Sequence, residues 1–148
     1  MRIAERNARW TGVRLLVTIG ALVVTIAACV TARDAVWKTV PDVSMPYERA
    51  WSIVTNAVTQ RFDLETSDAQ SGYLRTEWKV TGKDLLNMPM KKSRVIVRVE
   101  ERSPFRVKVK AEKQELNALT DEWVVTGNDE TVEGEIMGEL QGRLRASR

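Results

Sequence analysis

The segment 46–61 places apolar residues at the three- and four-residue spacing of a helix that is buried on one side. The shared apolar face consists of Tyr47, Ala50, Trp51, Val54 and Val58. Pro46 suits the first turn of a helix, and Ser44 suits a cap just before it. The pattern therefore predicts an amphipathic helix from Pro46 to about Arg61.

Residues 62–126 change to the two-residue alternation that is typical of half-buried strands. The predicted strands are 62–66, 73–80, 94–100, 105–112 and 122–126. In the second of these, the predicted inward residues are Leu74, Thr76, Trp78 and Val80. Residues 67–72 are predicted to form a turn, and 81–92 a longer connection. One apolar and one charged face per strand indicate an antiparallel sheet that is covered on one side only.

A final helix is predicted to begin at residue 129 or 130, since Asn128 or Asp129 can cap it. Its buried stripe consists of Val132, Ile136, Leu140 and Leu144. The predicted order is a helix, four to five strands and a helix. We therefore expect an α+β domain of two layers, in which a curved antiparallel sheet is packed against an N-terminal and a C-terminal helix.

The start of the chain has a different pattern. Four arginines lie within the first 14 residues, and 15–28 is an uncharged, mostly apolar run that ends directly before Cys29. A basic region, a short apolar core and small residues at its end are typical of a secretory signal peptide. Ile26-Ala27-Ala28-Cys29 resembles the bacterial lipobox, which implies a lipid on Cys29 and cleavage before it. The chain then divides into a signal peptide (1–28), a lipidated tether (29–43) and a domain (44–148).

An uncleaved anchor is the alternative interpretation of the same segment. Residues 15–32 contain no charged side chain, and their number is near the minimum for a helix that spans a bilayer. Lipidation is favoured because the apolar run before Cys29 is short for a span and because this lone cysteine has no disulfide partner in the chain.

Charge and composition exclude several classes of function. Four of the 23 Lys and Arg residues, but one of the 20 Asp and Glu residues, lie in 1–28, so the remaining chain is electrically balanced. Nucleic-acid binding therefore has no compositional support. The chain has no histidine and one cysteine, which excludes Ser-His and Cys-His nucleophile pairs and the usual zinc sites. We expect a non-enzymatic protein without a cofactor or a metal.

Three segments carry a resemblance to a known family: PYERAW at 46–51, FDLETSDAQSGYLRTEW at 62–78 and RVIVRVEERSPFRVKVK at 94–110. Together with the lipobox, they resemble the helix-grip domain of the BamC (NlpB) lipoproteins, accessory subunits of the outer-membrane β-barrel assembly machine. The resemblance covers about residues 44–146 and implies a helix-grip fold, a lipid anchor and a non-enzymatic role. The family has a long unstructured N-terminal segment and two grip domains, whereas this chain has a short tether and one domain.

The outward side of the predicted sheet carries more basic than acidic side chains. Its basic members, the cationic set, are Arg75, Lys79, Arg94, Arg98, Arg106, Lys108 and Lys110. One interpretation is a platform for an acidic partner, for phospholipid headgroups or for lipopolysaccharide phosphates. The other is a solvated face on which cross-strand ion pairs neutralise the charges.

The predicted connection 81–92 holds four apolar residues between lysines, namely Leu85, Leu86, Met88 and Met90. Exposed apolar loops often mark contacts with a partner or a membrane. The alternative is that this loop folds back over the core as a lid.

Three glycines recur every four residues in the last helix, at Gly134, Gly138 and Gly142. They share one face, which we call the glycine face, roughly opposite the apolar stripe. Each glycine costs about 0.5–1 kcal/mol relative to alanine inside a helix. Docking of another backbone on this face would explain that cost. The alternative is neutral sequence drift at exposed positions that tolerate any residue.

The sequence therefore predicts an envelope lipoprotein that serves as a non-enzymatic interaction or scaffold subunit, with outer-membrane protein assembly as the best-known example. The alternative is a grip-fold module that binds a lipid or another amphiphile between helix and sheet. Val30 rather than an aspartate follows Cys29, and the family's sorting rule then implies the periplasmic side of the bacterial outer membrane. The inner membrane stays open as a second location, and the partner is an unidentified envelope protein.

Overall fold

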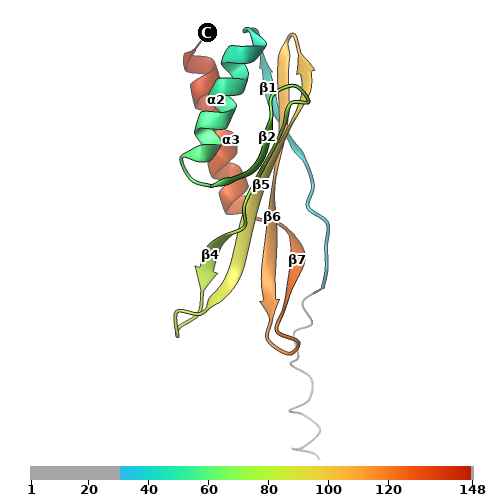
Figure 1. Ribbon diagram of the computed structural model, residues 1–148, viewed down its shortest axis with the longest axis vertical. Helices are drawn as coiled ribbons and strands as arrows, with labels where there is room; N and C mark the ends of the chain where they lie inside the picture. Colours follow the sequence, from blue (N-terminus) through green and yellow to red (C-terminus); the bar gives the residue numbers. More distant parts are fainter. Residues whose placement is uncertain (1–30, 148) are drawn as a thin grey trace, which may run out of the picture.

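The computed structural model describes residues 31–147, which form a single antiparallel sheet with two helices packed on one of its faces (Figure 1). The predicted signal peptide and the lipidation site at Cys29 lie outside the described residues. The elements, in chain order, are β1 (Lys38–Val43), α2 (Tyr47–Thr59), β2 (Leu64–Asp68), β3 (Tyr73–Thr76), β4 (Lys79–Lys83), β5 (Pro89–Arg102), β6 (Phe105–Asn117), β7 (Glu122–Asn128) and α3 (Glu130–Ala146).

Two long strands, β5 and β6, form a hairpin that runs the whole length of the sheet. Its upper half in Figure 1, next to the β5–β6 turn, is flanked by β1 on one side and by β3 and β2 on the other. Its lower half is flanked by β7 beside β6 and by β4 beside β5. The sheet thus has two halves that share a central hairpin.

The hydrophobic core lies between the upper half of the sheet and the two helices. Val97 of β5 pairs with Val109 of β6, and both side chains are fully buried. Trp51 of α2 and Phe105 of β6 are the large aromatic members of this core. The stripe of α3 that the sequence predicted, from Val132 to Leu144, is buried as expected. Burial of these apolar side chains is the main source of stability.

The helical layer stops where the inward face of the central hairpin changes from apolar to polar. Val95 opposite Ala111 is the last apolar pair on this face. The next inward pairs toward the lower end are Ser93 with Lys113 and Lys91 with Glu115. An apolar helix face would gain nothing by covering these groups. The lower half of the sheet therefore extends beyond both helices (Figure 1).

The α+β class and the two helices are confirmed, but the predicted number of strands is wrong. The sheet has seven strands instead of four to five. The predicted tether 29–43 contains β1, which pairs with β6, because Val40 and Val43 face the core and are buried there. The predicted connection 81–92 contains the end of β4 and the start of β5. Its true turn is only 84–88.

The predicted strand 73–80 is divided into β3 and β4, which pair with different parts of β5. Leu74 and Thr76 face the core as predicted. Trp78 does not, because the chain leaves the sheet after Thr76 and the amide of Glu77 instead donates a hydrogen bond to the carbonyl of Asp63, at 2.9 Å. The two-residue alternation that placed Trp78 and Val80 inward therefore does not continue through this break.

Among the described residues, no helix is both long enough and apolar enough to cross a membrane.

Candidate functional site

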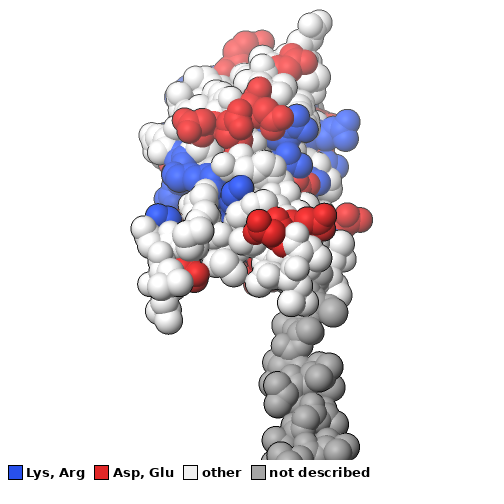
Figure 2. All heavy atoms as spheres, turned by 60° about the horizontal axis from the view of Figure 1, so that its bottom comes forward, with Lys and Arg blue, Asp and Glu red and all other residues white. Residues whose placement is uncertain are grey.

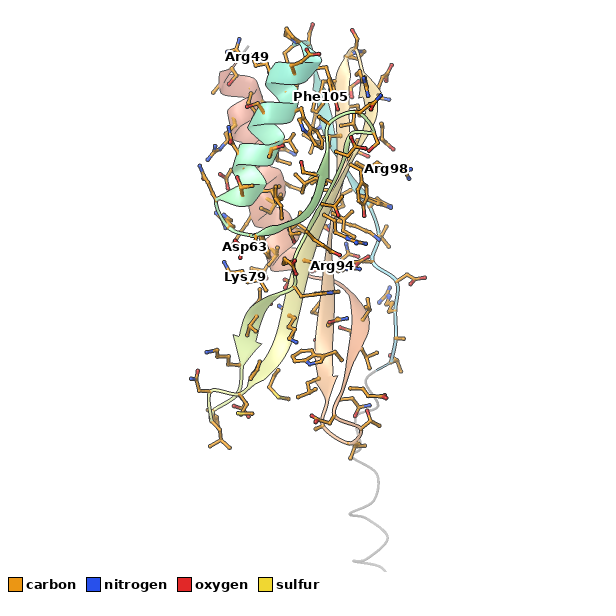
Figure 3. All side chains as sticks on the ribbon, in the orientation of Figure 1. Arg49, Asp63, Lys79, Arg94, Arg98 and Phe105 are labelled. Carbon is orange, nitrogen blue, oxygen red and sulfur yellow. The ribbon has the colours of Figure 1, made fainter. Side chains whose placement is uncertain are left out.

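The cationic set is dispersed in the structure more than the sequence suggested. Arg94 and Arg98 project from β5 on the side of the sheet away from the helices, and the apolar residue between them, Ile96, is only 5% exposed there. Lys79 lies on the other side (Figure 3): its Nζ donates to the carbonyl of Arg61 at 2.5 Å and lies 5.4 Å from the ring centroid of Phe62. Lys79 therefore supports the end of α2 and is not part of an outward platform.

Most members of the cationic set are paired with carboxylates. The ion pairs are Arg75–Glu65, Arg94–Glu112, Lys110–Glu112, Lys108–Glu100, Arg106–Asp42 and Arg106–Glu101, at 2.6 to 3.1 Å. Burial by itself would raise the pKa of Glu112, but the bonds from Lys110 and Arg94 outweigh it and lower that pKa. In the described part of the chain, Arg98 is the one member whose side chain has neither an ion pair nor a hydrogen bond. This geometry favours the solvated face with cross-strand ion pairs.

Sequence reasoning missed a second feature of the outward face, its half-buried tryptophans. Lys108 and Lys110 lie over the ring of Trp37, Arg94 lies over Trp78, and Lys92 lies over Trp123, with cation-to-centroid distances of 4.0 to 5.4 Å. Each aromatic ring is thus covered by a cationic stem, a favourable arrangement at partly exposed sites. These contacts use the cations internally and leave less of their charge for a partner.

The glycine face on α3 is open. A Cβ atom added at Gly134, Gly138 or Gly142 would meet nothing within 4 Å outside the local helix backbone. All three glycines are exposed, whereas Ile136 and Leu140 on the other side of α3 are fully buried. The structure therefore places the glycines where the domain's own packing does not need them.

The apolar segment 81–92 divides between a turn and a strand. Leu85, Leu86 and Met88 are exposed in the β4–β5 turn, whereas Met90 is half-buried in β5. They do not fold back on the core as a lid. The carboxylate of Asp84 accepts hydrogen bonds from the amides of Leu86 and Met88, at 2.9 and 2.8 Å, and so fixes the turn with its leucines outward.

A cleft of about 570 Å³ lies beside the first turn of α3, between the chain segment before β1 and the lower half of the sheet. At its base Asp129 caps the helix, with its side chain accepting a hydrogen bond from the amide of Val132. The Asp129 carboxylate also binds Nζ of Lys91 at 2.9 Å and accepts a hydrogen bond from Ser93. Thr81 extends this network through a 2.8 Å bond to the hydroxyl of Ser93.

The electrostatics of this cleft are internally balanced. Burial alone would raise the pKa of Asp129, but the hydrogen bond from Ser93 and the contact with Lys91 outweigh it, so that its pKa lies below the ordinary value. A second buried carboxylate, Glu133, pairs with Lys38 at 2.5 Å and raises the pKa of that lysine. Lys91 of β5 therefore neutralises the carboxylate that caps α3, and Lys38 of β1 neutralises a carboxylate within α3, so that both lysines hold the helix to the sheet.

The polar groups of the cleft hold α3 to the sheet and to β1. The walls are polar and charged, which does not suit an acyl chain. Both buried carboxylates are already paired, and in residues 31–147 no three potential metal ligands gather into a metal site. Core side chains that include Trp51 and Phe105 pack between the helices and the sheet, and a smaller pocket of about 250 Å³ lies at the edge of this space, between β1 and α3.

Comparison with known proteins adds no family assignment. No family model matches the chain, and no curated protein matches it.

Proposed function

We propose that this protein is a membrane-anchored envelope lipoprotein that acts as a non-enzymatic interaction or scaffold subunit. The observation that carries the proposal is the sequence around Cys29: a basic start, an uncharged core and a small-residue exit ending at the only cysteine. The fold is compatible with this role because the first strand, β1, begins at Lys38, nine positions after Cys29. A short link of this kind would hold the domain close to the membrane.

The scaffold role is favoured over the alternative, a module that holds an amphiphile between helix and sheet. Such a module needs a large apolar cavity between its layers, whereas Trp51, Phe105 and the valines around them pack together here, and the pocket between β1 and α3 has only about 250 Å³. The cleft of about 570 Å³ lies outside the core and is lined mostly by charged and polar groups. A helix-grip arrangement and a role in outer-membrane protein assembly, both implied by the resemblance to BamC, are the finer parts of the proposal.

Replacement of Cys29 by alanine is expected to abolish lipidation and leave a protein of precursor size. The thiol is the acceptor of the lipid, and cleavage follows lipidation. Metabolic labelling with palmitate in a Gram-negative host, followed by electrophoresis, measures both effects. Incorporation of label into wild type but not into Cys29→Ala supports the proposal. A wild-type protein that takes up no palmitate would refute the lipoprotein assignment and leave the uncleaved anchor.

The lipidated protein is expected in the outer-membrane fraction. Val30 follows the acylated cysteine, so the aspartate that retains lipoproteins in the inner membrane is absent from that position. Density-gradient separation of the two membranes measures the distribution. The matched control is Val30→Asp, which should move the protein to the inner membrane. Recovery of both proteins in the inner membrane would contradict this location.

A further inference from the structure

Two separate turns at the lower end of the sheet present exposed leucines. The β4–β5 turn carries Leu85, which is completely exposed, and Leu86, which is 81% exposed, beside Met88. The β6–β7 turn carries Leu119, which is 75% exposed and which sequence reasoning overlooked. We call Leu85, Leu86, Met88 and Leu119 the tip surface. Two independent turns with outward leucines at one end of a sheet are an unusual exposure of apolar side chains.

The backbone of each turn is fixed by local hydrogen bonds. In the β6–β7 turn, the side chain of Asn117 accepts from the amide of Leu119 at 3.0 Å, and its carbonyl accepts from the amide of Asp121 at 2.8 Å. Asp121 and, in the other turn, Asn87 adopt the left-handed conformation that Asp and Asn tolerate best. The leucines are therefore held outward before any contact is made.

The two turns project in the same direction. Beyond the pair Lys91–Glu115 the strand pairs β4–β5 and β6–β7 separate, and both end at the lower end of the molecule (Figure 1). Figure 2, which brings this end forward, shows two projecting lobes whose lower parts are mostly residues other than Lys, Arg, Asp and Glu, with acidic residues along the upper edge of the right-hand lobe and a smaller acidic patch on the left-hand lobe. A flat apolar surface can meet both turns at once.

The N-terminal part of the described chain leaves the domain at the same end. Arg33 forms a parallel bridge with Thr126 of β7, and its amide donates to the carbonyl of Val125 at 3.0 Å. Because β7 runs upward from the β6–β7 turn and the pairing is parallel, Thr31 lies on the side of Arg33 that faces this turn. Cys29 is two residues before Thr31, within about 7 Å along a fully extended chain.

We propose that the tip surface docks into the lipid surface of the membrane that anchors this chain. The membrane reaches this end of the domain through a lipid on Cys29 or through the uncharged segment 15–32. Leu85, Leu86 and Leu119 then enter the interfacial layer, where apolar side chains leave water. This inference rests on the proposed membrane anchorage and adds the orientation of the domain: sheet upright, helices away from the bilayer.

The contact is apolar rather than electrostatic. Lys83 and Lys92 lie near the tip surface, but Asp84, Asp121 and Glu122 lie there too. These two basic and three acidic side chains leave no positive surplus at this end, so anionic lipid adds no attraction. Insertion should therefore be similar in neutral and in anionic bilayers, and should change little with salt.

Nitroxide labelling of the full-length protein in vesicles tests the proposal. Leu86→Cys and Thr120→Cys carry the label at the two turns, and Ser103→Cys carries it at the β5–β6 turn, the matched hairpin turn at the opposite end. The vesicles contain phosphatidylethanolamine and phosphatidylglycerol. The ratio of label accessibility to oxygen over accessibility to a water-soluble nickel chelate is expected to be several-fold higher at both tip sites than at residue 103.

The double variant Leu85→Ser/Leu119→Ser, measured with the same labels, is expected to lower the ratio at the tip sites to that of residue 103. Its folding should be unaffected because both leucines are exposed. Equal ratios at all three sites in the parent protein would overturn the proposal. Protection of the tip labels from both reagents only after addition of other envelope proteins would also overturn it, and would indicate a protein-binding surface.

Failure of the anchor and failure of the tip contact are distinguished by the wild-type protein. Its only cysteine is Cys29, which accepts the nitroxide if it is free and rejects it if a lipid occupies the sulfur. A labelled Cys29 refutes lipidation, and the tip measurement is then made in the Cys29→Ala background, where 15–32 is the anchor. A blocked Cys29 with water-exposed tips refutes the docking alone.

Discussion

Replacing Gly134, Gly138 and Gly142 together by alanine is expected to raise the free energy of unfolding by about 2 kcal/mol, from about 0.5–1 kcal/mol per site. Alanine lowers the conformational entropy of the unfolded chain. The added methyl groups meet nothing within 4 Å, so no strain offsets this gain. Urea unfolding followed by circular dichroism measures the change.

Gly72→Ala is the matched control, because its effect should have the opposite sign. Gly72 has φ of +68°, and a Cβ there would lie 2.7 Å from Cβ of Val99. Alanine at this position is therefore expected to lower the free energy of unfolding. If the triple alanine variant were destabilised as well, the glycines would pack inside the domain, contrary to the structure.

The same triple variant bears on the predicted docking role of the glycine face. Three methyl groups would keep a partner backbone at a distance, so the loss of a specific envelope partner from co-purification would support docking. A stabler domain with unchanged partner recovery would mean that the face is idle. Drift on an exposed surface would then explain the glycines.

Replacing Asp129 by alanine is expected to lower the free energy of unfolding by about 2–3 kcal/mol, through loss of a helix cap and of charge-assisted hydrogen bonds. The side chain is 2% exposed and joins two elements: it caps α3, and it pairs with Lys91 and accepts from Ser93, both of β5. Its removal leaves Lys91 without its carboxylate. Denaturant unfolding of both proteins measures the difference.

Two further variants separate the contributions of Asp129. Asp129→Ser retains a good capping side chain but removes the charge, so it should be destabilised less than alanine. Glu130→Ala, the neighbouring acidic residue of the first turn, is exposed and should cost only about 0.3–1 kcal/mol through the helix dipole. If Asp129→Ala lowered the free energy of unfolding no more than Glu130→Ala does, the proposed link of Asp129 between α3 and β5 would be contradicted.

Acid should reduce the advantage of the wild type over Asp129→Ser. The pKa of Asp129 is lowered in the folded state, so the unfolded chain takes up the proton first as the pH falls. The stabilisation is therefore complete well above the unfolded pKa, which is about 3.9, and is lost as the pH falls through the lower folded value. Unfolding is measured at about pH 7, 5 and 3. The difference in free energy of unfolding between the wild type and Asp129→Ser should be the same at the first two pH values and smaller at the third. A free-energy difference that becomes larger in acid would contradict a lowered pKa of Asp129 in the folded state.

Local periodicity was sufficient to predict the helices and their buried faces. The apolar residues of α2 and α3 recur at helical spacing, and Asp129 is followed by two early glutamates, a combination that marks a helix start regardless of what the helix packs against. Alternation predicted the first part of β6 and the middle of β5 equally well, because these parts of the two strands have one face on the core. These are properties of single segments, so they can be predicted from the order of residues within each segment.

Pairing between distant segments decided the rest. The pattern of 38–43 is too short to reveal β1, and only the place beside β6 makes Val40 and Val43 core residues. The platform stayed open as one interpretation of the cationic set partly because one carboxylate partner, Asp42, lies on β1, a strand that the sequence did not predict. Ion pairing depends on distance in space, and that distance is set by strand order.

The amino-acid sequence by itself determined the α+β class, the two helices, the apolar face of the central hairpin and the pattern around Cys29, because each depends on neighbours in the chain. Only the tertiary structure decided that Trp78 leaves the core, that Lys79 turns to the helix side and that Leu119 joins Leu85 and Leu86 at one end. Exposure and the end of the sheet at which a turn lies follow from how the strands are paired. A single leucine in a polar turn does not indicate, from the sequence alone, whether it is exposed or at which end of the sheet it lies.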